Sequence, residues 1–329
     1  MQKERLFISE RKVTVDYDFF NESDKDITTE IAFPVPPFGV YDTDCGPRST
    51  FDDFRVWIDD KKKDFATEDH AIVSGTDQTQ LLRKLNIDIA TFGAYWGPPE
   101  KCRESETSQI DKLSAQDKAM LIQVGLLNND HWPKWKVFRT HHWTQTFPSR
   151  KTMHIRHEYA PGLGYHGVQL EDLYADTRKE KIAEALARPK GSPGSESDES
   201  YLYMAKEVDE LCVDPSLARK IKEVESERWK AGAQKYGAPP FPVEVDHLNV
   251  GVEWVEYILS TANSWKGPIK DFTLLVERPT AEGGGGPNYF VSFCWNGPVR
   301  RVDENHFEAH VTNFVPRKEL HVGFFFPNP

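Results

Sequence analysis

The alternation of apolar and polar residues is clearest from Trp143 to Gly164, where it predicts two strands separated by Pro148. Side chains of a strand point alternately to its two faces, so every second residue shares a face. On the second strand one face collects Met153, Ile155, His157 and Tyr159. His154 points to the other face, which is typical of an antiparallel sheet wetted on one side. Proline cannot donate a ladder hydrogen bond, so the stretch is expected to form a hairpin or a bent strand.

The same periodicity predicts further strands before and after a long helical stretch. Residues 13–19 and 27–33 alternate around the polar segment NESDKD and predict a β-hairpin. Other strands are expected at residues 51–58, 252–260, 269–277, 289–295, 306–314 and 320–326. Helical spacing and capping residues predict helices at 78–85, 114–127, 168–187, 201–211 and 214–229.

These elements predict an α+β fold that is mainly β, with an antiparallel β-sandwich-like core and a helical insertion. Residues 1–164 are expected to form a β-rich N-terminal part with short helices. Residues 165–241 would form the helical insertion, which contains a polar, flexible linker at residues 189–200. Residues 242–329 would form a β-rich C-terminal part that completes the same core.

The charge balance is acidic: 41 Lys and Arg stand against 52 Asp and Glu, a formal net charge of −11. An acidic surface repels phosphate backbones, so no nucleic-acid partner is expected. The chain has no uninterrupted apolar run of about 18 residues, so no integral membrane segment is expected. Its first ten residues lack the apolar core and cleavage site of a signal peptide. Taken alone, this start suits a cytoplasmic protein or an exported one that has lost its leader.

Histidine is the residue type with the most catalytic potential, and four histidines cluster near the strand pair: His141, His142, His154 and His157. Neither a metal-ligand spacing nor a GxSxG nucleophile elbow occurs in the sequence. We therefore predict no catalytic residue, no cofactor and no metal site.

The four cysteines are Cys45, Cys102, Cys212 and Cys294. They form no CxxC pair, which argues against zinc ribbons and thioredoxin chemistry. Two disulfides and four buried thiols are both compatible with their positions.

Aromatic side chains are the remaining candidates for ligand contact, because such rings can stack on sugars or pack against a partner. Loop tryptophans such as Trp96, Trp132 and Trp135 belong to this group. The candidate contacts are Trp143, His157, Tyr159 and Trp265.

Five stretches are distinctive as a set: LFISERKVTVDYDFFNESDKDITTEIAFPVP, WTQTFPSRKTMHIRHEYAPGLG, YILSTANSWKGPIKDFTLLVER, VSFCW and NFVPRKELHV. In this order they resemble a family of secreted or periplasmic bacterial proteins known only as domain of unknown function 4424. The resemblance covers nearly the whole chain and implies one elaborated domain. It brings no established activity, cofactor or catalytic residue. Members have a leader and a further short segment before the LFIS strand, so the start at Met1 departs from the family.

The resemblance implies a periplasmic or secreted protein, in which the cysteines would form disulfides. The expected pairs are Cys212 with Cys294, and Cys45 with Cys102. The leading functional hypothesis is a non-enzymatic extracytoplasmic module of the cell envelope that binds a protein or a glycan. The alternatives are a metal-assisted hydrolase that uses the His141–His157 region, and a structural subunit of an envelope assembly.

Overall fold

The structure is a computed structural model that describes residues 1–39, 51–90, 112–236, 249–279 and 289–327. The chain divides into two compact units, and it passes between them several times. Unit 1 comprises Met1–Glu4, Val15–Gly162 and Ser264–Gly267. Unit 2 comprises Arg5–Thr14, Leu163–Asn263 and Pro268–Pro329.

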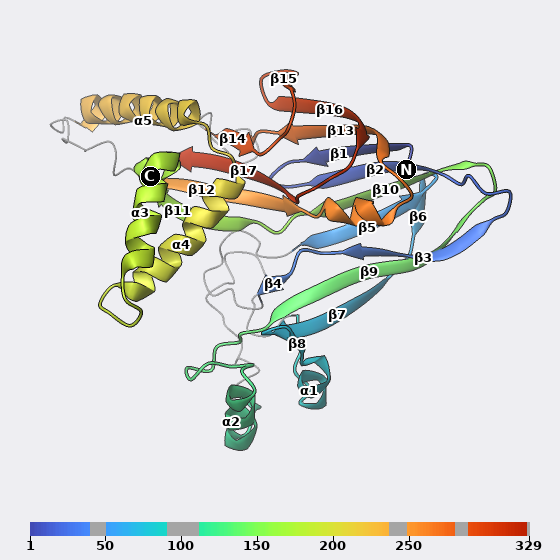
Figure 1. Cartoon of the computed structure of the whole chain (residues 1–329), viewed down its shortest axis with the longest axis horizontal. Coiled ribbons are helices and arrows are strands. Elements are labelled where there is room, and N and C mark those ends of the chain that lie inside the picture. Colours follow the sequence, from blue (N-terminus) through green and yellow to red (C-terminus); the bar gives the residue numbers. More distant parts are fainter. Residues whose placement is uncertain (40–50, 91–111, 237–248, 280–288, 328–329) are drawn as a thin grey trace. The chain divides into compact units, whose positions relative to one another are not determined.

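Unit 1 is built from two groups of strands (Figure 1). The first has the order β2-β10-β5-β6, with bounds Val13–Phe20, Thr152–Ala160, Asp52–Ile58 and Lys61–Lys63. The second has the order β3-β9-β7-β8, with bounds Ile27–Pro34, Lys136–Phe147, Ala66–Val73 and Thr76–Asp77, and β4 (Phe38–Gly39) pairs with β9. Rings from both groups meet in the interior, where Trp143 of β9 lies 5.6 Å from His157 of β10 between ring centroids. Unit 1 is thus a β-sandwich.

The predicted hairpin of residues 13–19 and 27–33 is wrong. Strand β2 neighbours β10, whereas β3 pairs with β9 from Ile27 opposite Phe147 to Pro34 opposite Thr140. The stretch around Pro148 is likewise no hairpin, because β9 and β10 belong to different sheets. Both polar turns carry the chain from one layer of the sandwich to the other. The apolar residues of β2 and β10 are largely buried, whereas the best-buried residues of β3, Ile31 and Phe33 among them, are only partly buried.

Two short helices of unit 1, α1 (Thr79–Lys84) and α2 (Ala115–Gln123), cover one end of the second sheet. Ser114 caps α2 as predicted, since its hydroxyl accepts a hydrogen bond of 3.1 Å from the Asp117 backbone N–H. The apolar cluster beneath the helices is formed by residues of the helices, of β7 and β9 and of the loops. Its members include Leu82, Leu121, Leu126, Trp135 and Val137.

Unit 2 has two further groups of strands. One has the order β15-β16-β13-β1, with bounds Val299–Arg301, His306–Phe314, Ile269–Glu277 and Lys3–Ile8. The other has the order β11-β12-β17-β14, with bounds Gly164–Gln169, Asn249–Tyr257, Leu320–Pro327 and Phe290–Phe293. The helical elements are η3 (Leu170–Leu173), α3 (Ala175–Ala187), α4 (Ser195–Glu210), α5 (Pro215–Tyr236) and η5 (Ser260–Ser264). The predicted class is confirmed: the chain is mainly β, with antiparallel sheets and a helical insertion.

Helices α4 and α5 pack on one face of the β11-β12-β17-β14 sheet (Figure 1). The shared apolar cluster includes Met204, Val208 and Ile221 from the helices and Val252, Trp254 and Phe325 from the strands. Within the described ranges no helix is both long and apolar enough to cross a membrane.

The helical stretch differs from the expected boundaries at two points. Residues 164–169 form β11, paired with β12, so the first α-helix of this stretch, α3, begins at Ala175. The predicted flexible linker at 189–200 ends at Gly194, because Ser195 opens α4. Acidic residues near a helix N-terminus are stabilised by the helix dipole, and Asp198 in addition pairs with Arg188 at 2.8 Å.

Candidate functional site

Three of the four predicted ligand contacts meet inside the unit 1 sandwich. His157 lies 5.6 Å from Trp143 and 5.1 Å from Phe33, and Tyr159 lies 4.4 Å from Phe51, all between ring centroids. These side chains are buried, except for Phe33, which is partly exposed. They form a hydrophobic core that fixes the two sheets, and the hypothesis that they contact a ligand remains a prediction.

Burial dominates the electrostatics of this core. It lowers the pKa of His157 to about 3, with a smaller contribution from His141, and it raises the pKa of Tyr159 well above its ordinary value. Among the described residues neither ring nitrogen of His157 has a hydrogen-bond partner. Burial also lowers the pKa of His141 to about 4, although Nδ1 of His141 lies 2.9 Å from the Thr67 hydroxyl. Both imidazoles are therefore neutral at physiological pH.

Trp265, the fourth predicted contact, lies elsewhere in unit 1, where its ring packs 4.5 Å from that of Phe19. Of the other loop tryptophans, Trp132 is exposed and Trp135 is buried with Nε1 donating to the Ile89 carbonyl at 3.0 Å. Trp96 lies outside the described residues.

The four histidines named for the hydrolase hypothesis face different surroundings. His141 and His157 lie among aromatic rings. His142 pairs with Glu30 at 2.7 Å, and His154 contacts Asp18 at 2.9 Å and Asp16 at 3.3 Å. The carboxylates in this region thus pair with the outward-facing His142 and His154.

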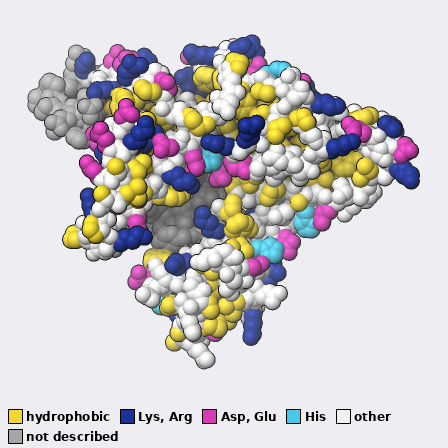
Figure 2. Space-filling view, in the orientation of Figure 1, with side chains coloured by type: hydrophobic (Ala, Val, Ile, Leu, Met, Phe, Trp, Pro, Cys, Tyr) yellow, Lys and Arg dark blue, Asp and Glu magenta, His cyan; other side chains and the backbone are white. Residues whose placement is uncertain are grey.

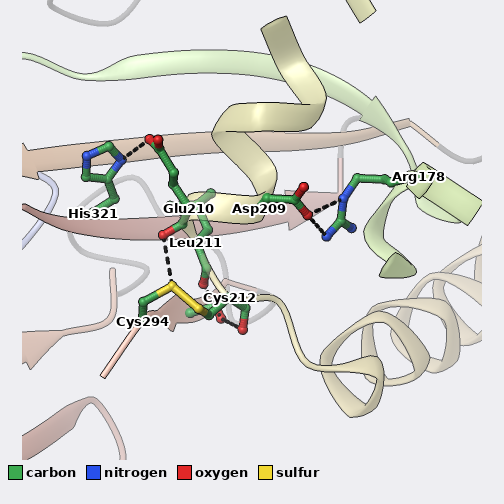
Figure 3. The surroundings of a disulfide bond; sticks show 8 residues. Arg178, Asp209, Glu210, Leu211, Cys212, Cys294 and His321 are labelled. Carbon is green, nitrogen blue, oxygen red and sulfur yellow. Dashed lines mark hydrogen bonds and ion pairs between the residues drawn. A yellow bond between two sulfur atoms is a disulfide. The ribbon is translucent and has the colours of Figure 1, made fainter. Parts of the chain in front are cut away.

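The predicted disulfide between Cys212 and Cys294 is confirmed (Figure 3). It joins the residue two positions after α4 to the residue that follows β14, and the hydroxyl of Ser292 adds a 2.9 Å hydrogen bond to the Leu211 carbonyl. The C-terminal end of α4 is thereby fixed to the sheet. Cys45 and Cys102 lie outside the described residues.

A surface site of a different kind lies on the β11-β12-β17-β14 sheet. Three rings form a row across it, which we call the aromatic row: Tyr165 of β11, Phe326 of β17 and Tyr289 just before β14. Ring centroids are 6.5 Å apart between Tyr165 and Phe326 and 5.1 Å apart between Phe326 and Tyr289, with interplanar angles of 29° and 25°. Tyr165 ends the row on an edge strand and is 43% exposed.

Two glycines shape the floor beside the aromatic row. Gly167 and Gly251 face each other across β11 and β12. A Cβ at Gly251 would meet the Phe326 ring at 2.4 Å, so the absence of a side chain lets this ring lie close to the strand. A Cβ at Gly167 would meet nothing within 4 Å. The floor next to Tyr165 is therefore open.

Two carboxylates adjoin the aromatic row. Glu253 is the cross-strand partner of Tyr165, and its Oε2 is buried without a hydrogen-bond partner among the described residues. Burial, assisted by the negative charge of Glu10, raises the pKa of Glu253 to about 7. Burial also raises the pKa of Glu10. Burial and then these two charges raise the pKa of Tyr289 to about 12, so both carboxylates lie near that ring. Perturbed carboxylates beside one exposed and two partly exposed rings mark a functional-site candidate.

Replacing Glu253 by glutamine is expected to stabilise the chain at pH 8. The carboxyl has a folded pKa of about 7 against an ordinary 4.5, so stability falls as pH rises from about 4.5 to 7 and stays low above that range. Glutamine removes this penalty, which we expect to be about 1–2 kcal/mol after allowing for solvent screening of a partly exposed group. Urea unfolding at pH 8 and pH 5 measures the effect.

At pH 5 Glu253 is protonated in the folded parent but still partly ionised in the unfolded chain, so the gain from Glu253→Gln should fall to about a quarter of its value at pH 8. Glu180→Gln on the exposed side of α3 is the matched control, and it should change little at either pH. An equal gain at both pH values would contradict the raised pKa.

The sequence pattern missed the aromatic row and its carboxylates. The pattern of residues 252–260 predicts a strand and leaves Glu253 as an unexplained charge within it. That charge, with Gly251 two positions before it, was the available signal. Its meaning depends on the pairing of Glu253 with Tyr165, from a strand that is distant in sequence.

Comparisons with known proteins agree with the family resemblance. A family model described as "Domain of unknown function (DUF4424)" matches residues 1–322. No curated protein matches the chain. Among solved structures, a similar one is the crystal structure of "a putative nutrient binding protein" from Legionella pneumophila subsp. pneumophila str. Philadelphia 1, with a TM-score of 0.39 and 14% sequence identity. The match covers 99% of this chain, which spans 66% of that protein's length.

Proposed function

The chain belongs to the family described as domain of unknown function DUF4424, and we propose that it is a non-enzymatic binding protein that holds a glycan at the aromatic row. This proposal extends to an extracytoplasmic location in the bacterial cell envelope, periplasmic or secreted. Disulfides persist in oxidising compartments, and the Cys212–Cys294 bond supports this location.

The observation that carries the proposal is the pairing of Tyr165 with Glu253 across β11 and β12. An exposed ring offers an apolar surface on which the C–H face of a sugar can stack. The unpartnered Oε2 of Glu253 can accept a hydrogen bond from a sugar hydroxyl, which would satisfy a buried acceptor. Ligand sites commonly combine apolar and aromatic walls with a few polar groups in this way.

Two features favour a glycan over a protein partner or a cation. Gly167 leaves the floor open beside Tyr165, and the Glu253 carboxyl is recessed beside it, so the polar group is reached by a small moiety. The three rings are nearly parallel to their neighbours, whereas a quaternary ammonium ion is typically enclosed by a cage of rings.

Binding of uncharged hexose and N-acetylhexosamine oligosaccharides to the full chain, measured on a glycan array and then by calorimetry, tests the proposal. Tyr165→Ala is expected to weaken binding at least tenfold, because it removes the stacking surface. Gly167→Val should do the same by filling the open floor, and its Cβ clashes with nothing. Phe138→Ala is the matched control, since Phe138 is similarly exposed at 42% but lies on β9 in unit 1.

The proposal fails if no oligosaccharide binds, or if Tyr165→Ala and Gly167→Val bind as the parent does. Binding of tetramethylammonium in place of sugars would assign the row to a cationic ligand. Capture of an envelope protein that is lost in both variants would assign it to a protein partner.

A further inference from the structure

Metal-ligating side chains converge at a second place in unit 2, away from the aromatic row. Glu207 and Glu210 of α4 and His321 of β17 each offer one ligand atom, and these atoms all lie within 4.8 Å of one another. We infer that they form a binding site for a divalent transition metal such as Zn²⁺, with Glu256 as a nearby third carboxylate. We call these four residues the Glu–His cluster.

The fold holds all four residues in place before any metal arrives. Glu207 and Glu210 are three residues apart on α4, so they share one helix face. Glu256 and His321 are direct partners in the β12–β17 ladder and share one sheet face, with His321 Nε2 lying 4.0 Å from Glu256 Oε1. Figure 2 shows acidic side chains gathered around a histidine near where α4 meets the sheet.

The disulfide fixes the helix against the strands at this point. Cys212 follows Glu210 by two residues, and the Glu210 carbonyl lies 3.2 Å from Cys294 Sγ (Figure 3). Arg178 of α3 also holds this end of α4, since its Nε donates to Asp209 at 3.0 Å. A site whose ligands sit on anchored elements loses little conformational freedom when the metal binds.

The contacts of His321 indicate a ligand rather than a satisfied core residue. Its side chain is only 13% exposed, and the buried Nδ1 lies 3.0 Å from Glu210 Oε2 without meeting hydrogen-bond geometry. A ring nitrogen and a carboxylate oxygen that approach side by side in this way can coordinate one ion between them. The second oxygen of Glu210 contacts Lys206, which is 68% exposed and can move away to solvent.

Charge and donor type select the metal. Three carboxylates lie around His321, and among the described contacts one cation, Lys206, pairs with them. The carboxylates therefore carry an excess of negative charge, which a divalent cation would neutralise. Ca²⁺ and Mg²⁺ prefer oxygen ligands alone, whereas imidazole with carboxylates suits Zn²⁺, Fe²⁺ and related ions. Three protein ligands would leave one position of a tetrahedral ion for Glu256 or water.

Calorimetric titration of the full, chelator-treated chain with Zn²⁺, in the absence of thiol reductants, tests the inference. We expect one ion per chain and an increase in the unfolding temperature. Glu207→Gln and His321→Gln should each weaken binding at least tenfold. The matched controls are Glu30→Gln and His142→Gln, which alter an exposed His–Glu pair of unit 1 with a 2.7 Å contact, and they should bind Zn²⁺ as the parent does.

A second measurement separates lost ligands from lost folding. Without metal, Glu207→Gln removes the repulsion between two neighbouring carboxylates, so it should unfold at the same temperature as the parent or higher, while its Zn²⁺-induced shift disappears. A parent chain that binds neither Zn²⁺ nor Mn²⁺, or cluster variants that bind as tightly as the parent, overturns the proposal. Glycan binding by His321→Gln should be unchanged, which keeps this test independent of the aromatic row.

Discussion

Replacing both Cys212 and Cys294 by serine is expected to lower the free energy of unfolding by about 4 kcal/mol. The disulfide joins residues separated by 82 positions in the sequence. A cross-link that closes a loop of that length removes unfolded-state entropy worth about 4–5 kcal/mol at 25 °C in the chain-entropy model. In the double variant the end of α4 stays attached to β14 through the hydrogen bonds of Ser292 and the packing of Phe290, without the covalent link. Urea unfolding of the parent and the double variant under oxidising conditions measures the difference.

Reduction provides the control for this prediction. A reductant should bring the parent down to the stability of the double variant, and it should leave the double variant unchanged if no other disulfide exists. A further loss of stability in the reduced double variant would instead reveal the second predicted bond, between Cys45 and Cys102. A double variant as stable as the parent would show that packing of α4 on the sheet suffices without the bond.

The same region links stability to the inferred metal site. Glu210 precedes the disulfide by two residues and is a member of the Glu–His cluster. Loss of the bond frees the end of α4 to fray, because the last turn of a helix has few backbone partners of its own. The double cysteine variant is therefore expected to bind Zn²⁺ more weakly than the parent even where it remains folded. The stability of the chain and its affinity for Zn²⁺ would then both depend on how the C-terminal end of α4 is held.

Local patterns predicted the strands well because alternation is a property of each strand alone. On β10 the expected face of Met153, Ile155, His157 and Tyr159 is buried, and His154 faces the other side, where it contacts Asp18. The N-cap at Ser114 and the Cys212–Cys294 pair were also predicted correctly. In each of these cases the deciding signal lies within a few residues or in a family resemblance.

The pairing of strands that are distant in the sequence could not be predicted from such local patterns. The apolar face of residues 27–33 fits equally well beside residues 13–19 or beside β9, and only the packing of the whole sandwich selects β9. Both candidate sites depend on such pairings. Tyr165 meets Glu253, and His321 meets Glu256, only because β12 pairs with β11 on one side and with β17 on the other. In the sequence alone, where these pairings are not visible, each of these residues is only an isolated charge or an isolated ring.

Acidification from pH 8 to pH 5 is expected to lower the free energy of unfolding by about 2 kcal/mol through His157 alone. The folded pKa of His157 is about 3, against an ordinary value of 6.5 in the unfolded chain. The unfolded state therefore binds a proton between these values while the folded state does not, so stability is fully present above pH 6.5 and falls as pH decreases toward 3. His141, with a folded pKa of about 4, adds a loss in the same direction.

His157→Phe isolates this contribution, because phenylalanine keeps a ring among Phe33, Phe54 and Trp143 and cannot be protonated. The variant should equal or exceed the parent at pH 8, since no hydrogen bond from the imidazole is lost among the described residues, and should exceed it by about 2 kcal/mol at pH 5. His310→Gln, at an exposed ion pair with Asp271, is the matched control and should keep the parent's pH dependence. A variant whose stability falls with acid as steeply as the parent's would show that His157 does not remain neutral in the folded core. The acid sensitivity would then have to arise from other groups such as His141, whose pKa burial lowers to about 4.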